Sequence, residues 1–368
     1  MIPVAEKIQT DVLVVGAGPA GSVAARYAAE KGLNVTMIEC RPEVGVPVRC
    51  GELMPSQQEI VDMFPTLEDP DDLFDLPESL HVSPVEAIRL YDPKAKVYEF
   101  PFTGYTTDRD RFDQYLAKQA VDSGANLIRS CRFHKHEGKV AHTNQGDIEF
   151  KVIIGADGPS SRVAKSLGLP ANQNSYPAVS AQAEGDFDPV VQMFFGDIAP
   201  GAYGWIMPKK GQANVGIGFS PKFSNGSLSG YFKTFSEKRG LNVKTQIHGK
   251  FVPSEGPVAK TYVDGTGMVI GDAAGVVMPV NGGGIPQAMI TGRIAGQVAA
   301  ENILHGGSLA QYEESWRSVL YKPLKIAAGN KKLADTFAFK TEFRTSLCMS
   351  ILGTRRMGKL IRCKRLFP

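Results

Sequence analysis

The sequence contains few cysteines and no long apolar run. Its 368 residues include five cysteines, at positions 40, 50, 131, 348 and 363, and none of them forms a Cys-x-x-Cys pair. A disulfide framework is therefore not expected, and a reducing, cytoplasmic compartment is the simpler interpretation. Apolar stretches such as Val276–Val280 fall far short of the roughly 20 residues that a membrane-spanning helix needs. Residues Met1–Lys7 lack the basic segment and apolar core of a signal peptide, so we expect neither a leader nor a spanning helix.

The composition is that of an ordinary globular protein, but its charge is unevenly distributed. Hydrophobic residues make up 43% and charged residues 21% of the chain, which excludes wholesale disorder. The length indicates two domains and a small appendage. Although the net charge is only +3, residues 322–368 hold twelve Lys or Arg against two Asp or Glu.

The first forty residues predict a βαβ unit. Asp11–Val15 reads as a short buried strand, Gly16–Gly21 as a turn and Ser22–Lys31 as an Ala-rich helix. A second strand, Val35–Ile38, ends at the acidic residue Glu39, 18 positions after the last glycine of the turn. This Gly-x-Gly-x-x-Gly arrangement is typical of dinucleotide binding.

Each residue of this fingerprint has a physical role. Gly16 makes the tight turn, Gly18 lets the backbone approach a pyrophosphate, and Gly21 packs the helix against the strand. Free N–H groups at the helix start bind the phosphates, and Glu39 accepts a hydrogen bond from a ribose hydroxyl. No second fingerprint follows, so a nicotinamide would bind transiently without its own Rossmann unit, or the electrons come from another donor.

Downstream the pattern stops alternating between strand and helix. Residues 85–102 and 178–219 read as strands joined by turns, whereas Arg109–Ser123 and Pro286–Leu304 read as helices. We therefore expect an α/β fold in which a Rossmann-type nucleotide-binding domain is interrupted by an antiparallel-sheet substrate domain, followed by a short C-terminal helical, basic region. The expected boundaries are 1–80, 105–175 and 255–310 for the first domain, 81–104 and 176–254 for the second, and 311–368 for the C-terminal region.

Three spaced motifs resemble those of the FAD-dependent monooxygenase-like superfamily with the p-hydroxybenzoate hydroxylase fold. They are Gly16–Gly21 with Glu39, Ala156-Asp157-Gly158, and Gly271-Asp272-Ala273-Ala274. Narrower features resemble the geranylgeranyl reductase family, and within it the archaeal digeranylgeranylglycerophospholipid reductases. These features are Arg41–Gly45 running into Pro47–Glu52, Arg109-x-x-Phe112-Asp113, Tyr203-Gly204-Trp205 with Pro208-Lys209, Val215–Gly218, and Pro279–Ile285.

The resemblance implies an FAD-dependent oxidoreductase acting on CH–CH groups. Such an enzyme saturates C=C bonds of isoprenoid chains in archaeal membrane glycerophospholipids, by hydride transfer from reduced flavin plus a proton. The electron donor, whether NADPH, NADH or ferredoxin, is not determined. The fingerprint and the resemblance together imply cofactor contacts from Gly16, Gly18, Ala20, Gly21, Glu39, Arg49, Cys50, Gly51, Leu53, Arg109, Phe133, Asp157, Gly271, Asp272, Gly283, Gly284 and Ile285.

Three residues are candidates for catalysis: Cys50, Tyr203 and Trp205. Arg49 next to Cys50 favours a thiolate, so Cys50 is expected at the flavin face as a proton donor or as a residue that tunes the ring; the alternative is a small buried residue that only packs there. Tyr203 and Trp205 occupy alternate positions of a strand, so both face one side. With Pro208 they could line an apolar substrate tunnel, or they could be core aromatics of the inserted sheet.

Other residues carry weaker signals. Gly282–Gly284, at a helix start, would let N–H groups reach the flavin pyrimidine carbonyl, where negative charge develops on reduction. Arg109 lies at a helix start, where a cation is unfavourable, which indicates an anionic partner such as the FAD phosphates. His134, His136 and His142 cluster without Cys or carboxylate ligands at metal spacing, so a solvated loop is expected and no metal.

The basic C-terminus predicts contact with a membrane. Its apolar residues Met357, Leu360, Ile361, Leu366 and Phe367 alternate with cations, as in a helix lying on an anionic lipid surface. A solvated charged tail or a nucleic-acid contact are the alternatives. We expect a peripheral protein at the inner face of the cell membrane, with a prenylated lipid substrate, a redox partner and no nucleic acid.

Two other functions fit the same fold. A flavin monooxygenase or halogenase would need a hydroperoxide-handling site and, in halogenases, a lysine and a Trp-x-Trp motif, where this chain has Tyr203 and Gly204. An electron-relay flavoprotein docked at the membrane would hold the cofactor without reducing lipid.

Overall fold

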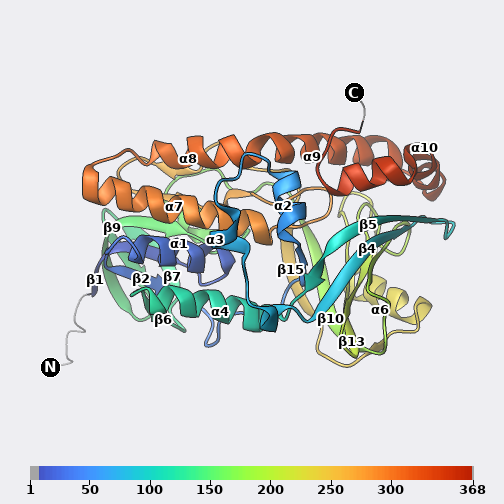
Figure 1. Ribbon diagram of the computed structural model, residues 1–368, viewed down its shortest axis with the longest axis horizontal. Helices are drawn as coiled ribbons and strands as arrows, with labels where there is room; N and C mark the ends of the chain where they lie inside the picture. The colour runs from blue at the N-terminus through green and yellow to red at the C-terminus, as the bar shows by residue number, and fades with distance from the viewer. Residues whose placement is uncertain (1–7, 367–368) are drawn as a thin grey trace.

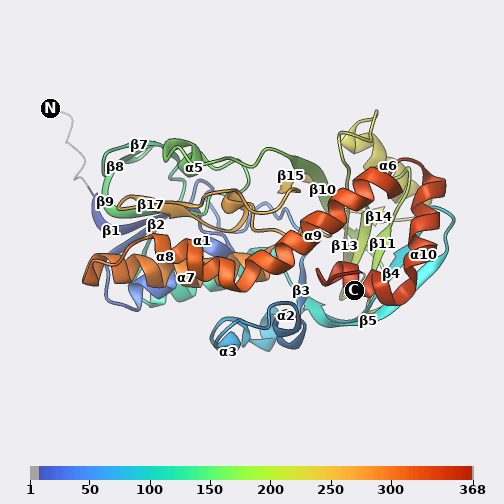
Figure 2. The same ribbon diagram turned by 90° about the horizontal axis from the view of Figure 1, so that it is seen from above.

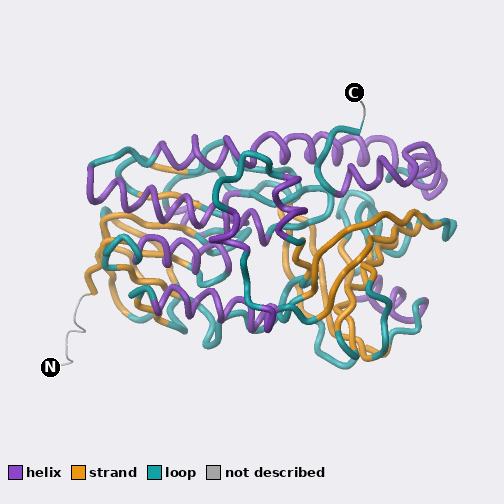
Figure 3. The backbone as a smooth tube through the Cα atoms, in the orientation of Figure 1, coloured by secondary structure: helices purple, strands orange, loops and turns teal. Residues whose placement is uncertain are grey.

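The computed structural model describes residues 8–366, which fold around two β-sheets placed side by side along the long axis of the molecule (Figure 1). Figure 3 shows that a layer of helices runs across the top of both sheets. No helix within residues 8–366 is both long enough and apolar enough to cross a membrane.

The first sheet is mainly parallel. Its central strand, β1 (Ile8–Val15), pairs in parallel with β2 (Val35–Ile38) on one side and β9 (Gly146–Gly155) on the other. The strand order is β16-β17-β9-β1-β2-β6, and the β7–β8 hairpin is attached to β9. The remaining strands are β6 (Asn126–Ile128), β7 (Phe133–Glu137), β8 (Val140–Thr143), β16 (Tyr262–Val263) and β17 (Gly267–Val269). Strand β2 is buried throughout, as a continuous apolar run requires when both sheet faces are covered.

Close helix packing covers this sheet. α1 (Pro19–Ala29) contacts both α4 (Arg109–Asp122) and α7 (Ile285–His305) (Figure 1). A β-carbon at Gly292 would lie 2.4 Å from the carbonyl oxygen of Ala20, and one at Gly296 would lie 2.5 Å from that of Ala24. The small residues of α7 therefore let the two helix backbones touch, with the start of α1 beside Gly292, two turns into α7.

The second sheet is almost entirely antiparallel, in the order β14-β10-β13-β12-β11-β4-β5-β3, with β15 paired to β10. Only β11 and β4 run parallel. Its strands are β3 (Leu53–Pro55), β4 (Ser83–Tyr91), β5 (Val97–Thr106), β10 (Ser175–Glu184), β11 (Val190–Phe194), β12 (Gly204–Lys209), β13 (Gln212–Gly218), β14 (Asn242–Val243) and β15 (His248–Pro253). The short elements between strands are α2 (Gln57–Met63), α3 (Pro70–Phe74), α5 (Arg162–Ser166), α6 (Leu228–Lys238) and η1 (Glu78–Leu80), and η2 (Gly271–Ala274) joins β17 to α7.

The C-terminal helices connect the two sheets. α8 (Ala310–Trp316), η3 (Arg317–Tyr321), α9 (Lys322–Leu333) and η4 (Ala334–Ala338) lead from the first sheet to the second, where α10 (Glu342–Ile361) closes the chain (Figure 2). α10 is bent at Gly353, whose φ of 61° and ψ of 174° are not helical. Its second half packs on β5, because a β-carbon at Gly358 would lie 3.4 Å from the ring of Phe100.

The expected fold class is confirmed: a Rossmann-type sheet, an inserted antiparallel sheet and C-terminal helices. The helices predicted at 109–123 and 286–304 are observed at Arg109–Asp122 and Ile285–His305.

The predicted lipid-facing side of the tail is wrong. Met357 and Ile361 are only 2% and 5% exposed, and with the half-buried Leu360 they belong to the apolar cluster on the second sheet. Leu366 is half-buried, and Phe367 lies outside the described residues. Packing on Phe100 therefore turns this apolar side inward rather than toward lipid.

Candidate functional site

The three glycine-rich motifs meet at the carboxyl ends of neighbouring strands. A β-carbon at Gly16, after β1, would lie 2.4 Å from the carbonyl oxygen of Ala156, after β9. A β-carbon at Gly271, after β17, would lie 3.1 Å from the β-carbon of Ala20. Ligands of open α/β sheets bind at this edge, and the motifs therefore form one site.

The start of α1 is built to accept an anion. Its N-cap, Gly18, has no side chain to cap the helix, and the first turn contains no acidic residue. Apart from its chain neighbours, no heavy atom of the described residues lies within 4 Å of a β-carbon placed on Gly18, so the space beside the helix start is open. Unsatisfied N–H groups and the helix dipole favour a phosphate there.

Glu39 lies at the end of β2, beside the same turn. Its Oε2 accepts a hydrogen bond from the backbone N of Ala17 (3.1 Å), and its Oε1 accepts one from that of Arg41 (3.0 Å). A carboxylate has about four acceptor positions, so the half-buried Glu39 can also accept from ribose hydroxyls.

The start of α7 forms a second anion-accepting end. Its N-cap, Gly284, also provides no side-chain cap, and the helix has no acid in its first turn. The backbone N of Gly283 donates to Oδ1 of Asn281 (2.9 Å). The carboxylate of Asp272 pairs with Lys250 (2.6 Å). Gln287, in the first turn of α7, is fully buried, and neither of its amide atoms has a partner among the described residues. This part of the site therefore fits an additional polar group such as a flavin dinucleotide.

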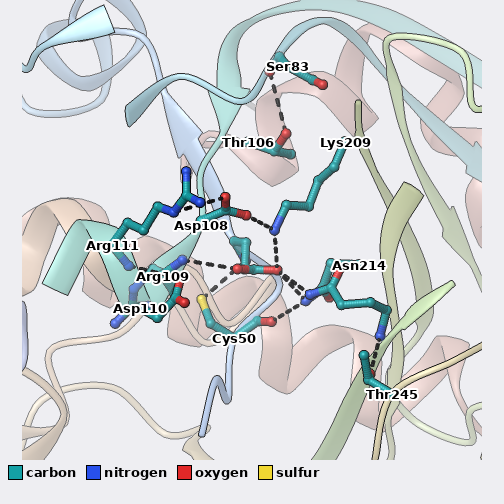
Figure 4. A network of polar contacts seen from close by, with 12 residues as sticks. Cys50, Ser83, Thr106, Asp108, Arg109, Asp110, Arg111, Lys209, Asn214 and Thr245 are labelled. Atoms are coloured by element: carbon teal, nitrogen blue, oxygen red, sulfur yellow. Dashed lines mark hydrogen bonds and ion pairs between the residues drawn. The ribbon is translucent and has the colours of Figure 1, made fainter. Parts of the chain in front are cut away.

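An amide bridge joins two of the expected catalytic residues, Trp205 and Cys50, and Figure 4 shows the half of it between Asn214 and Cys50. The indole N–H of Trp205 donates to Oδ1 of Asn214 (2.8 Å), and Nδ2 of Asn214 donates to the carbonyl oxygen of Cys50 (2.8 Å). Between them, a β-carbon at Gly51 would lie 3.7 Å from the indole nitrogen. Asn214 therefore fixes the indole plane relative to the Cys50 turn.

A buried ion cluster lies beside this bridge (Figure 4). The side chains of Glu52 and Lys209 are 1% and 2% exposed, and Lys209 Nζ lies 3.0 Å from Glu52 Oε2 and 2.5 Å from Asp108 Oδ1. Burial acts to lower the pKa of Lys209, but the two carboxylates outweigh it, and the pKa is raised. Lys209 is therefore a permanent cation of the site.

The carboxylate of Glu52 is surrounded by donors. Its Oε2 also accepts from Nδ2 of Asn214 (2.8 Å) and Nε2 of Gln182 (2.7 Å), while Oε1 accepts from the backbone N of Arg109 (3.0 Å). Its backbone has a φ of 66°, which is uncommon for a residue other than glycine. One side chain thus holds the Cys50 turn, three strands of the second sheet and the start of α4 together.

The anionic partner expected for Arg109 is a protein carboxylate. The guanidinium forms a two-bond pair with Asp113, one turn along α4, at 2.9 and 3.0 Å. Burial opposes the charge, but Asp113 and Cys50 outweigh it and raise the pKa of Arg109. The guanidinium therefore also places a positive charge near the thiol of Cys50, whose Sγ accepts from the backbone N of Glu52 (3.2 Å).

Tyr203 connects the second sheet to the glycine turn of α7. Its hydroxyl donates to the carbonyl oxygen of Asn281, and its ring centroid lies 6.0 Å from that of Trp205 at 62°. Burial, with the neighbouring Cys50, raises the pKa of Tyr203 well above its ordinary value. Tyr203 therefore remains a phenol at neutral pH. Trp205 belongs to the apolar cluster with Met193, Met207 and Phe100, and Tyr203 packs against that cluster.

Several predicted contacts have other partners or stand apart. The carboxylate of Asp157 accepts from the Ser161 hydroxyl (2.5 Å) and two backbone N–H groups at the start of α5, and burial raises its pKa. The carbonyl oxygen of Pro208 accepts a hydrogen bond from the Thr106 hydroxyl (2.6 Å). The remaining predicted residues lie as follows: Arg49 is exposed, Leu53 is half-buried in β3, Phe133 is buried and its carbonyl accepts from Arg162, and Ile285 is buried. Among the described residues no three His, Cys, Asp or Glu side chains gather around a common metal position.

Sequence reasoning missed the ion cluster and the amide bridge. Glu52 follows the Cys50 turn directly and Lys209 follows Pro208, so both lie inside quoted motifs. The available signal was that Glu52 and Lys209 each stand within a largely apolar motif. A charge in such a place indicates burial only when its oppositely charged partner is known.

Comparison with known proteins identifies the family. A model described as the geranylgeranyl reductase catalytic domain matches residues 175–252, and one described as an NAD(P)-binding Rossmann-like domain matches residues 14–67. Digeranylgeranylglycerophospholipid reductase 2 of Methanopyrus kandleri is 34% identical over 89% of this chain and 87% of its own length. The reductase of that name from Methanosarcina acetivorans is 36% identical over 83% of this chain and 80% of its own length.

Solved structures agree in fold. A geranylgeranyl bacteriochlorophyll reductase-like protein from Thermoplasma acidophilum superposes with a TM-score of 0.78 at 31% identity, covering 89% of this chain and 87% of that chain. A flavin-dependent brominase has a TM-score of 0.70 at 17% identity, covering 96% of this chain and 92% of that chain, and shows the fold alone. From the identity and coverage of the reductases, the chain belongs to the geranylgeranyl reductase family.

Proposed function

We propose that this protein is an FAD-dependent reductase that saturates C=C bonds in the isoprenoid chains of archaeal membrane glycerophospholipids. The names of its relatives support the reaction and the substrate class. The observation that carries the proposal is the contact between the aromatic pair and the nucleotide site: Tyr203 bonds to the Asn281 carbonyl beside the start of α7, and Trp205 is tied to Cys50 through Asn214. An apolar substrate surface thus adjoins the place where a flavin would lie.

The chain would hold FAD at three points. The N–H groups at the start of α1 would bind the pyrophosphate, Glu39 would bind the ribose, and the N-terminus of α7, at Gly284 and Ile285, would face the flavin ring. Reduced FAD supplies the hydride for the reaction. The positive end of α7 would stabilise negative charge on the ring. We assign this cofactor to segments 1–80, 105–175 and 255–310, and the substrate to 81–104 and 176–254.

The second hydrogen reaches the alkene as a proton, and Cys50 is the better placed donor. The hydroxyl of Tyr203 is engaged by the Asn281 carbonyl, and its raised pKa makes it a weak acid. In contrast, the Sγ of Cys50 accepts a bond from the backbone, which leaves its proton available. The guanidinium of Arg109 lies near this sulfur.

The reductant and the location are part of the proposal. With one dinucleotide fingerprint, the chain would receive electrons from NADPH, NADH or ferredoxin during a transient encounter. We place the protein in the cytoplasm, at the inner face of the cell membrane, because a membrane lipid is the substrate and the C-terminal region is cationic.

Anaerobic incubation with dithionite and an unsaturated archaeal lipid tests the function. The expected product gains one H2 per double bond in its mass spectrum. A product that requires oxygen would indicate a monooxygenase or halogenase instead, and unchanged lipid with flavin still bound would indicate an electron relay.

A further inference from the structure

An exposed apolar face lies at the end of the C-terminal helices. We call it the docking face and define it by Leu333 and Phe337, at the end of α9 and in η4, and Phe343, Leu347 and Ile351 in α10. These five side chains are 46% to 63% exposed. Exposed apolar residues of soluble monomers are normally scattered singly, so their concentration in one segment calls for a partner.

The first half of α10 has an apolar stripe on its outer, solvent-facing side. Phe343, Leu347 and Ile351 follow one another at four-residue steps and so form one stripe on the helix. Thr345 and Ser346, together with Met349, point inward and are buried instead. The buried side with Met349 therefore faces the protein, and the apolar stripe faces solvent, where no described residue covers it.

The surroundings of this stripe are cationic. Lys94 Nζ lies 5.5 Å from the ring centroid of Phe343, and Lys96 Nζ lies 3.3 Å from the Ser350 hydroxyl. Lys332, Lys340 and Arg344 are exposed between the apolar positions.

The five exposed cations outnumber the acids beside them, which are Asp335, Glu342 and Asp197. Asp335 is paired with Lys331. Glu342 accepts a bond from the backbone N of Asp197 (3.0 Å). An apolar stripe rimmed by cations complements an anionic lipid surface.

The inner side of the same helix reaches the proposed substrate surface. Met349 and, beyond the bend at Gly353, Met357 belong to the apolar cluster that contains Trp205, against which Tyr203 packs. α10 therefore has the docking face on its outer side and the substrate-binding sheet on its inner side.

We infer that the docking face seats this protein on an anionic lipid bilayer, with Phe343, Leu347 and Ile351 inserted among the headgroups and acyl chains. The inference rests on the proposed function for its choice of a lipid surface over a soluble partner. The sequence alone predicted lipid contact through Met357 and Ile361, which are buried. The docking face assigns that contact to exposed side chains instead.

Vesicle flotation tests the inference with the full-length protein. The probes are vesicles of phosphatidylcholine alone and of phosphatidylcholine mixed with phosphatidylglycerol. The parent protein should float with the mixed vesicles and be released by salt. The triple variant Phe343→Ser, Leu347→Ser, Ile351→Ser should bind at least about tenfold more weakly, as lost apolar burial requires. Lys340→Glu with Arg344→Glu should weaken binding to the mixed vesicles only.

A matched control uses apolar side chains of similar exposure elsewhere. Val121→Ser with Leu304→Ser, in α4 and α7, should leave flotation unchanged. Activity on lipid dispersed in detergent separates the docking inference from the proposed function. The triple variant should retain this activity. A parent protein that floats but is inactive would refute only the proposed function. Undiminished flotation of the folded triple variant would overturn the inference. The inference would also be overturned if the parent protein were a dimer that the triple variant dissociates. The docking face would then bind a second copy of the chain.

Discussion

Replacing Glu52 with Leu should destabilise the protein strongly. The change leaves the buried Lys209 with Asp108 alone and removes the acceptor of Gln182 and of the Arg109 backbone. Breaking a buried ion pair by removing one partner costs about 3–5 kcal/mol. We expect a loss in this range, because Asp108, at 27% exposed, is partly hydrated and only partly compensates.

Urea unfolding followed by tryptophan fluorescence measures this loss. The Glu237→Leu variant is the control, since Glu237 is 65% exposed and lies 3.9 Å from Lys233; surface pairs of this kind contribute about 0–1 kcal/mol. Lys209→Met in the Glu52→Leu background should restore part of the stability, giving a coupling energy of at least about 1 kcal/mol.

The pH dependence has a definite sign. Because the folded-state pKa of Lys209 is raised, its stabilising charge is fully present below the unfolded pKa of about 10.4 and is lost only as pH rises through the higher folded value. The penalty of Glu52→Leu should therefore stay constant between about pH 6 and pH 9. The reasoning is refuted if Glu52→Leu costs no more than Glu237→Leu.

Two further substitutions test other parts of the site, and a labelling experiment tests the packing of the C-terminal region. Gly216→Ala would place a β-carbon 2.2 Å from the indole of Trp205, so it should cost about 1–3 kcal/mol and shift the fluorescence, whereas Gly218→Ala, with 3.7 Å of clearance, should do neither. The added methyl of Gly18→Ala meets no atom of residues 8–366 within 4 Å apart from its chain neighbours, so the variant should fold with an unchanged melting temperature but purify with much less flavin absorbance; full flavin content would contradict the phosphate assignment. Burial raises the pKa of Cys363 to about 12, so peptide mapping should find it alkylated by iodoacetamide at mildly alkaline pH only in urea, and rapid native labelling would contradict its burial.

The elements predicted best are those whose signals are local in sequence. The strand–turn–helix of Gly16–Gly21 and its acid Glu39 lie within one βαβ unit, where hydrophobic period and glycine spacing determine the geometry directly. The order of the glycine motifs likewise follows from parallel strands that end at one edge of the sheet.

The interactions that could not be predicted join distant residues. Lys209 and Glu52 are 157 positions apart, and no pattern around either residue indicates that their charges are buried together. Similarly, α10 has apolar residues on two sides, and only its packing on Phe100 decides that Met357 faces inward while Ile351 faces out. Arg109 was correctly expected to have an anionic partner, but a carboxylate four residues away supplies it.

The most direct test of the account follows the bound flavin itself. The flavin-loaded protein is reduced without oxygen and mixed in a stopped-flow instrument with unsaturated archaeal lipid, or with the same lipid already saturated. The account predicts that flavin absorbance returns only with the unsaturated lipid, because only a C=C bond can accept the hydride. Reoxidation at equal rates with both lipids, or with neither, would contradict it.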